Sequence, residues 1–329
     1  MNKFARLVMT FAVWGIAIVM PVPLHAWSEG GHHLIAVIAF NLLSGDEQEK
    51  LLTILKKHPR FEEDFKLPDN LTTELDKQRW LVGRAAYWPD VARRQPLFHR
   101  STWHYELGAS QIIGDRSELN IPQRPRALPL ESTLETKELY ISQALELCQR
   151  AMHDQTTSAE DRAVALCWLG HLVGDAHQPC HAGSLYMQGV FETEDGDRGA
   201  NSIPTKQRRN MHALWDGLLG SDWSLGGNRR RFLEITQDSE LMNLGRQSVV
   251  AGIDPAGWLS ESRSLAVEHV YTDEVLSSLH LVRRGVVEKP QEIELTEGYL
   301  KNAGRVAQRR AVQAGYRLAE VWRQAIKEQ

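Results

Sequence analysis

Apolar positions along this chain recur mostly at helical spacing, and hardly any stretch alternates as a half-buried strand does. The run over 31–43 is apolar almost all round, which predicts a buried helix. Ser44 followed by Glu47 is a capping-box pattern, so we expect an amphipathic helix from there through Lys57. The pattern therefore predicts an all-α fold with long irregular loops.

Later helices follow from the same periodicity. Ser158 with Asp161 marks the start of a helix that runs into residues 166–181. Pro89 is expected to break the helical piece over 85–94, which would put Asp90 at a helix start. Further helices are expected over 69–83, 132–153, 229–247, 254–271 and 293–327, a short extended segment over 99–107, and loops over 108–130 and 189–206.

The first 26 residues have the pattern of a secretory signal peptide. Lys3 and Arg6 precede an apolar stretch over 7–22, and Ala26 ends a small-residue cleavage site. The apolar stretch is short for a membrane span, so we expect cleavage and no stable membrane association afterwards. Cleavage would make Trp27 the N-terminus of a periplasmic or secreted protein.

Composition favours a globular protein, with 42% hydrophobic and 24% charged residues among 329. No Gly/Ser-rich or Pro-rich linker divides the chain, so residues 27–329 are predicted to form one domain, as a monomer. The net charge of −4 argues against a broad basic nucleic-acid surface, but not against an enzyme that holds phosphates through metal ions. Cys148, Cys167 and Cys180 are too few for a disulfide scaffold, although Cys148 and Cys167 could pair.

Residues 166–181 hold the densest group of candidate metal ligands. His171 and Asp175 are four positions apart, so they share one face of a helix. Pro179 is expected to end that helix and to let His181 return toward the same point. Imidazole nitrogen and carboxylate oxygen are ordinary zinc ligands, but a helix with buried, hydrogen-bonded His and a capping Asp would have the same spacing.

Other His and Asp residues, most of them near helix ends or on helix faces, extend this group. His212 and Asp216 repeat the spacing of four positions. The full set of candidate ligands is Trp27, His32, Asp90, His104, His171, Asp175, His181, His212 and Asp216.

The order of these residues resembles that of the three-zinc, single-strand-specific nucleases of fungi, plants and bacteria, and the resemblance covers nearly all of 27–329. It rests on six motifs: Trp27-x4-His32, Trp88-Pro89-Asp90, Trp103-His104-Tyr105, the segment Gly170 to His181, the segment Gly196 to Asn201, and Asn210-Met211-His212-x3-Asp216. The residue before His181 is Cys180, where the family more usually has Leu.

The resemblance implies an enzyme with three zinc ions. The implied ligands are Asp90, His104, His171 and Asp175 for one ion; the α-amino group and carbonyl of Trp27 with His32 and Asp175 for a second; and His181, His212 and Asp216 for the third. Asp175 would then bridge two ions, and only signal cleavage would free the amine of Trp27.

The implied reaction is hydrolysis of single-stranded DNA or RNA to 5′-phosphate products by zinc-activated water. Asp90 and Arg93 would be catalytic, with Arg93 also contacting the substrate phosphate, unless Arg93 is a surface residue one turn into a helix. Asn201 would bind substrate or fix its own loop. Gly217 offers no side chain where a base contact is expected, so base preference stays open, as does 3′-nucleotidase activity.

Two other functions agree with part of the pattern. A zinc-dependent phospholipase C shares the implied fold and a similar cluster, but its first Trp and His are further apart and its last ligand is typically Glu. The spacing Trp27-x4-His32 and the ending Asp216 both favour a nuclease. A periplasmic protein that binds zinc without catalysis is the third interpretation.

Overall fold

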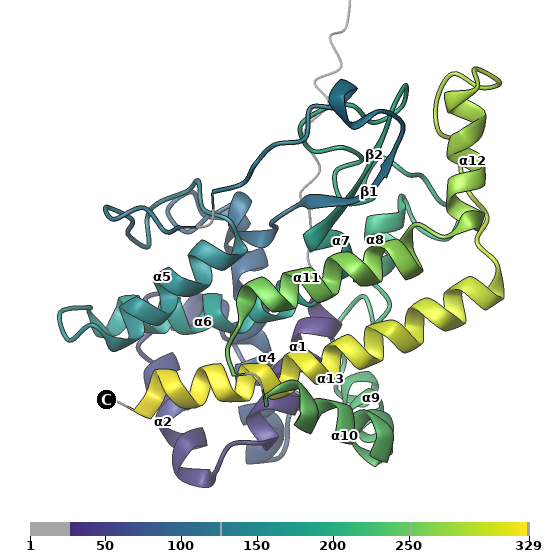
Figure 1. Ribbon diagram of the computed structural model, residues 1–329. Helices are drawn as coiled ribbons and strands as arrows, with labels where there is room; N and C mark the ends of the chain where they lie inside the picture. The colour runs from purple at the N-terminus through teal and green to yellow at the C-terminus, as the bar shows by residue number, and fades with distance from the viewer. Residues whose placement is uncertain (1–26, 126, 251, 328–329) are drawn as a thin grey trace, which may run out of the picture.

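The computed structural model describes residues 27–125, 127–250 and 252–327, and the predicted signal peptide lies outside them. Helix α1 (Glu29–Asn41) contacts α4 (Glu74–Val91), α6 (Ala159–Ala176) and α13 (Glu297–Lys327). Helices α2 (Gly45–Leu55) and α5 (Ile141–His153) cover α6 from other sides, as Figure 1 shows. The result is a helical layer around α6.

Helix α6 has a long, continuous buried stretch. The Ser158 side chain accepts a hydrogen bond from the Asp161 N–H and caps its first turn, as predicted. Every residue from 163 to 176 is buried, which is the packing that an apolar helix in the middle of a protein requires. The polar side chains of this segment therefore lie deep inside the molecule.

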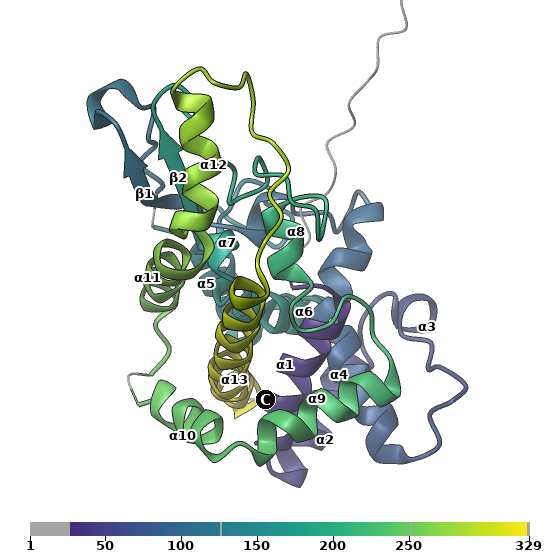
Figure 2. The same cartoon turned by 90° about the vertical axis from the view of Figure 1, so that its right-hand side faces the viewer.

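A small parallel sheet lies at one end of the helical layer. Strand β1 (Gly108–Ile113) pairs with β2 (Gly183–Met187), with Gly108 opposite Gly183 and Ile113 opposite Met187. Figure 2 shows both strands beside α12 (Asp273–Arg283). Strand β2 directly follows α7 (Pro179–Ala182), so the sheet fixes the chain just after the motif that ends at residue 181.

The remaining elements surround this frame. They are α3 (Phe61–Asp64), α8 (Met211–Asp216), α9 (Leu225–Gln237), α10 (Ser239–Ser248), α11 (Pro255–Leu265), a π-helical turn (Ala266–Val270), and short 3-10 helices at Ala92–Arg94, Thr102–His104 and Arg116–Glu118.

The predicted helical fold is confirmed, but the break at Pro89 was wrong. Helix α4 passes through Pro89, so Asp90 lies in its last turn instead of at a helix start. Proline removes one backbone donor, and near a helix end that loss leaves most of the hydrogen-bond ladder intact. The capping box of Ser44 and Glu47 is present as predicted. Helix α4 itself begins after Thr73, whose side chain caps it, and not at residue 69.

Several element boundaries also differ from the prediction. Helix α5 begins at Ile141, not at 132, and the segment 229–247 divides at Asp238, which caps α10. The 99–107 segment contains a 3-10 turn, while the extended strand β1 lies in the predicted loop 108–130. Helix α12 was not predicted. Strand β1 has no burial alternation, so its pairing with β2 and not its own pattern defines it.

The three cysteines are buried and free, so Cys148 and Cys167 form no disulfide. Burial raises the pKa of all three thiols, which makes each of them inert rather than reactive at neutral pH. Within 27–327, apart from the two omitted positions, no helix has the length and apolar character to cross a bilayer.

Candidate metal centre

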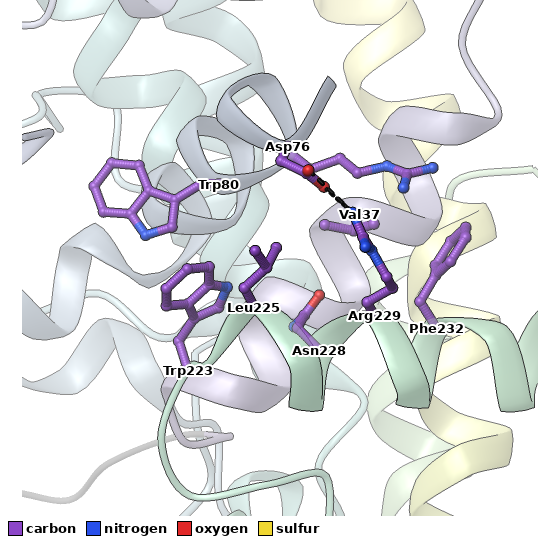
Figure 3. A pocket seen from close by; sticks show the side chains of 9 residues that line it. Val37, Asp76, Trp80, Trp223, Leu225, Asn228, Arg229 and Phe232 are labelled. Carbon is purple, nitrogen blue, oxygen red and sulfur yellow. Dashed lines mark hydrogen bonds and ion pairs between the residues drawn. The ribbon is translucent and has the colours of Figure 1, made fainter. Parts of the chain in front are cut away.

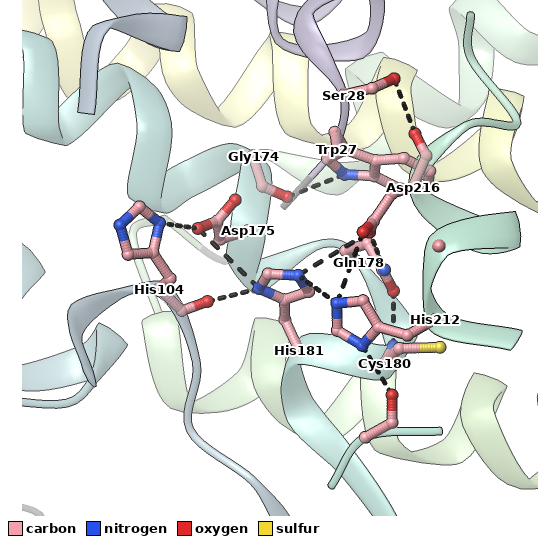
Figure 4. A network of polar contacts seen from close by, with 12 residues as sticks. Trp27, Ser28, His104, Gly174, Asp175, Gln178, Cys180, His181, His212 and Asp216 are labelled. Carbon is pink, nitrogen blue, oxygen red and sulfur yellow. Dashed lines mark hydrogen bonds and ion pairs between the residues drawn. The ribbon is translucent and has the colours of Figure 1, made fainter. Parts of the chain in front are cut away.

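Three groups of buried His and Asp side chains have donor atoms close enough to hold a metal ion. In each group these atoms lie within 4.8 Å of one another. The groups are His32, Asp90 and His171; His104, His171 and Asp175; and His181, His212 and Asp216. The first two share His171 and form one continuous cluster, whereas the resemblance assigned His32 to a different ion from Asp90 and His171. The third matches the implied set, and Figure 4 shows its three residues beside Asp175.

Asp175 lies at the centre of these groups, in the last turn of α6. Its Oδ1 is 3.4 Å from His32 Nε2, and its Oδ2 is 3.2 Å from His171 Nε2 and 3.4 Å from His104 Nδ1. Neither oxygen accepts a hydrogen bond from any residue that the structure describes. Burial raises the pKa of Asp175 to about 7, so its charged form needs a cation nearby.

Backbone carbonyls fix the orientation of three imidazole rings. His171 Nδ1 donates to the Ala86 carbonyl at 2.8 Å, and His212 Nδ1 donates to the Gly199 carbonyl at 2.6 Å. His181 Nδ1 donates to the carbonyl of His104. A carbonyl can only accept, so Nδ1 carries the proton in each ring and Nε2 turns its lone pair toward the cluster.

Burial also keeps the imidazoles of His32, His104 and His171 neutral. Desolvation lowers the pKa of His32 and His104, and it lowers the pKa of His171 to about 4. A neutral ring offers the lone pair that a metal ion requires. The donor set therefore fits zinc: neutral nitrogens and carboxylate oxygens, enclosed and short of hydrogen-bond donors.

A strained loop holds the carbonyl that orients His212. Arg198 and Ala200 have φ values of 62° and 66°, in the left-handed region that non-glycine residues rarely adopt, and Gly199 between them has φ 60°. Buried Asp197 stabilises this conformation, because its Oδ1 accepts hydrogen bonds from the Leu185 N–H at 3.0 Å and the Tyr271 hydroxyl at 3.1 Å. The loop thus fixes the orientation of the His212 ring in the third group.

The chain at Trp27 and Ser28 lies between α6 and α8. The Trp27 indole is fully buried, and its Nε1 donates to the Gly174 carbonyl at 3.0 Å. Ser28 donates to the Asp216 carbonyl through its N–H at 3.0 Å and its hydroxyl at 2.9 Å. These contacts place the Trp27 backbone between the residue before Asp175 and the end of α8.

Arg93 is not a surface residue. Its side chain is 8% exposed, and its Nε donates to Asp90 Oδ1 at 2.7 Å. Its Nη2 is buried and has no hydrogen-bond partner among the described residues. The surface interpretation of Arg93 was therefore wrong, because the 3-10 turn after α4 directs the side chain back over Asp90.

A family model described as S1/P1 Nuclease matches residues 27–327. This chain belongs to the S1/P1 nuclease family. The predicted family is thereby confirmed, as is the prediction of an endonuclease that hydrolyses phosphodiesters.

Two plant relatives illustrate the extent of the similarity. Endonuclease 1 of Arabidopsis thaliana is 24% identical over 318 residues, which cover 94% of this chain and 90% of that protein. Endonuclease 3 of the same plant is 22% identical over 197 residues, which cover 59% of this chain and 54% of that protein. The first alignment takes in both the helical layer and the segments that hold the three groups.

Within this family member, Gln178 is a site residue that the sequence interpretation did not single out. Its Nε2 donates to Asp216 Oδ1 at 2.6 Å, and its Oε1 accepts the Cys180 N–H at 2.5 Å. Burial raises the pKa of Asp216 well above its usual value, and the Gln178 bond opposes that rise. The sequence did contain a signal for this role. Proline is common at the first position of a helix, so Gln178, the residue before Pro179, is expected to cap α7.

The other polar residues of the motifs have structural contacts. His177 faces away from the cluster: its Nδ1 bonds the Val173 carbonyl at 2.7 Å and its Nε2 bonds Arg317 at 2.8 Å. Asn201 donates to the Arg198 carbonyl at 2.9 Å, which agrees with a role in its own loop. Asn201 also lines a pocket beside His212, so its side chain is still within reach of a ligand there.

One pocket adjoins these groups, and a smaller one is lined by none of their residues. One, of about 230 Å³, opens beside the third group and is lined by Ser28, Glu29, Tyr87, Asn201, Arg208, Arg209, His212, Ala213, Asp216, Gly217 and Ser221. The other holds about 20 Å³ between Trp80 and Trp223, where Arg229 bonds Asp76 at 3.0 Å (Figure 3). Its volume suits one or two waters, so of these two pockets the first is the one with room for part of a nucleotide.

Proposed function

We propose that this family member hydrolyses single-stranded DNA or RNA with three zinc ions, leaving 5′-phosphate products. The observation that carries this proposal is Asp175, a buried carboxylate that accepts no hydrogen bond from the described residues. It faces imidazole nitrogens of His171 on its own helix and of His32 and His104 from two other segments. A carboxylate in that environment is stable in its charged form only beside a cation. Family membership makes a phosphodiester the substrate.

The residues that would hold the ions are assigned as the resemblance implies, and the short distances from Asp175 to His32 and His104 support this assignment. The proposed ligands are Asp90, His104, His171 and Asp175 for one ion; the Trp27 amine and carbonyl, His32 and Asp175 for a second; and His181, His212 and Asp216 for the third. Zinc bound there would lower the pKa of a coordinated water and offset charge on the phosphate.

The protein side chains position the substrate around that centre. Arg93, held against Asp90, directs an unpartnered Nη2 that would donate to a phosphate oxygen, so both are proposed as catalytic residues. The Nδ1 bonds to carbonyls keep His171, His181 and His212 from rotating as substrate binds. The buried site excludes bulk water, which strengthens each of these interactions.

The location of the protein belongs to the same proposal. A free Trp27 amine requires removal of residues 1–26, and a signal peptidase outside the cytoplasm would supply that cut. The chain would then act as a periplasmic or secreted monomer of one domain, residues 27–329. The family match over residues 27–327 supports the domain boundary.

Metal analysis and a substrate panel test this function. We expect three zinc ions per chain in protein that begins at Trp27, and faster cleavage of single-stranded DNA or RNA than of duplex DNA. Lipid turnover without DNA cleavage would identify a phospholipase C instead. Full zinc occupancy without turnover of DNA, RNA or phosphatidylcholine would identify a zinc-binding protein without catalysis.

A further inference from the structure

The pocket beside the third group contains two arginines that no motif includes. Arg208 and Arg209 precede α8, and both line this pocket with His212 and Asp216. Their side chains are exposed, so they can reach a ligand in the pocket without rearrangement of the fold. Because the pocket borders the proposed third zinc site, a ligand bound there would adjoin the scissile phosphate.

Arg208 lies next to Gly217, the residue directly after Asp216. A Cβ on Gly217 would lie 3.4 Å from Arg208 Nη2, at van der Waals contact. Arg208 Nη2 also donates to the hydroxyl of Ser221. These contacts place the guanidinium beside the end of α8, close to Asp216.

The wall of this pocket carries two arginines, Arg208 and Arg209, and two carboxylates, Glu29 and Asp216. Within the described residues, neither Arg208 nor Arg209 has a carboxylate within 4.0 Å. The carboxylate of Glu29 lies 3.7 Å from a different arginine, Arg84. Arg231 adds a third cation, because its guanidinium packs against Gly220 in the turn that follows Gly217. In a chain of net charge −4, these unpaired guanidinium groups favour an anion in the pocket.

We propose that Arg208 and Arg209 bind a backbone phosphate of the polynucleotide next to the phosphate that is cleaved. This inference rests on the proposed nuclease function and assigns the pocket to the substrate strand. A guanidinium binds a phosphate through two parallel N–H donors, and such contacts fix register without reading the base. The subsite makes the enzyme prefer a chain of nucleotides over a small diester with one phosphate.

A double variant tests the subsite. Arg208→Ala with Arg209→Ala is compared with Arg230→Ala, an exposed arginine on α9 that pairs with Glu234 at 3.8 Å and lies outside the pocket lining. The substrates are a thymidine 20-mer and bis(p-nitrophenyl) phosphate. We expect the double variant to raise KM for the 20-mer about tenfold or more and to leave kcat/KM for the small diester within about twofold.

Salt dependence gives a second readout. Loss of the contact to one backbone phosphate should reduce the slope of log(kcat/KM) against log[salt] by about 0.7 on the 20-mer. Equal losses on both substrates, or a 20-mer KM equal to that of Arg230→Ala, would overturn the proposal.

A binding measurement separates this proposal from the proposed function. Fluorescence anisotropy of a labelled thymidine 20-mer requires no turnover, so it reports on the subsite even in a protein without nuclease activity. Weaker binding by the double variant than by Arg230→Ala supports the subsite whatever the activity. Equal affinity of the double variant and Arg230→Ala for the 20-mer overturns the proposal. If the unaltered protein does not cleave DNA or RNA, that result contradicts the proposed function alone.

Discussion

Replacement of Asp175 by Asn separates two effects of this carboxylate: its cost to the stability of the metal-free protein and its contribution to zinc binding. Burial raises the pKa of Asp175 from 3.8 to about 7, so without a cation the folded state holds the proton more tightly than the unfolded state does. The tighter proton binding stabilises the folded state at low pH, and this stabilisation is lost as pH rises through about 7. A shift of about 3 units at about 1.4 kcal/mol each gives a penalty of roughly 4 kcal/mol at pH 8.

The amide of Asn has a similar shape and no charge, so it removes that penalty. In the presence of EDTA at pH 8, we expect Asp175→Asn to unfold at a temperature equal to or higher than the unaltered protein, by up to about 8 °C. With zinc the order reverses, because each ion at about 1,000 times its Kd adds about 4 kcal/mol and two ions depend on Asp175 in the proposed site.

Differential scanning fluorimetry with and without EDTA, together with zinc content by mass spectrometry, measures both effects. His181→Ala is the control, because in the proposed site it removes a ligand of the third ion alone. Asp175→Asn should lose two zinc ions and His181→Ala one. A lower melting temperature of Asp175→Asn in EDTA, or equal zinc loss in the two variants, would refute this reasoning.

Three further predictions concern other parts of the molecule. One extra residue before Trp27 should remove one zinc ion and most activity, and unchanged zinc content would exclude the amine as a ligand. Arg93→Ala should lower kcat/KM on single-stranded DNA by roughly a hundredfold with three zinc ions retained, and loss of zinc instead would make its role structural. Burial lowers the pKa of His58 to about 4, so stability should fall as pH drops from 6.5 toward 4, because the unfolded state takes up the proton first. His58→Asn should reduce the loss measured by urea unfolding between pH 7 and pH 5, and an unchanged loss would contradict this assignment.

The helical fold could be predicted because its signals are local. The capping pairs at Ser44 and Ser158 and the apolar run of α1 depend on neighbouring residues only, and each is present in the structure. Strand β1 depends on a partner far away in the chain. No pattern within residues 108–113 encodes the pairing with β2, which makes that segment a strand.

The same distinction applies to the site. His and Asp are few and chemically distinct, so their spacing and the order of the motifs are enough to single them out. Gln178, Arg208 and Arg209 are ordinary residues whose function comes from what they face: Asp216 for the first, and a pocket wall for the others. Sequence reasoning therefore finds groups that could bind metal more readily than groups that would bind substrate.

The proposed centre couples folding to metal binding. Its side-chain donors come from α1, α4, the 3-10 helix Thr102–His104, α6, α7 and α8. Three of its rings are oriented by carbonyls of other segments, such as Ala86 for His171 and Gly199 for His212. No short fragment could hold this arrangement, because each ring depends on a contact that exists only in the complete fold. Conversely, the buried carboxylates Asp175 and Asp216 weaken the fold at neutral pH until a cation offsets their charge. Zinc would then act as part of the core as well as of the chemistry, so a mild loss of zinc should be followed by loss of structure.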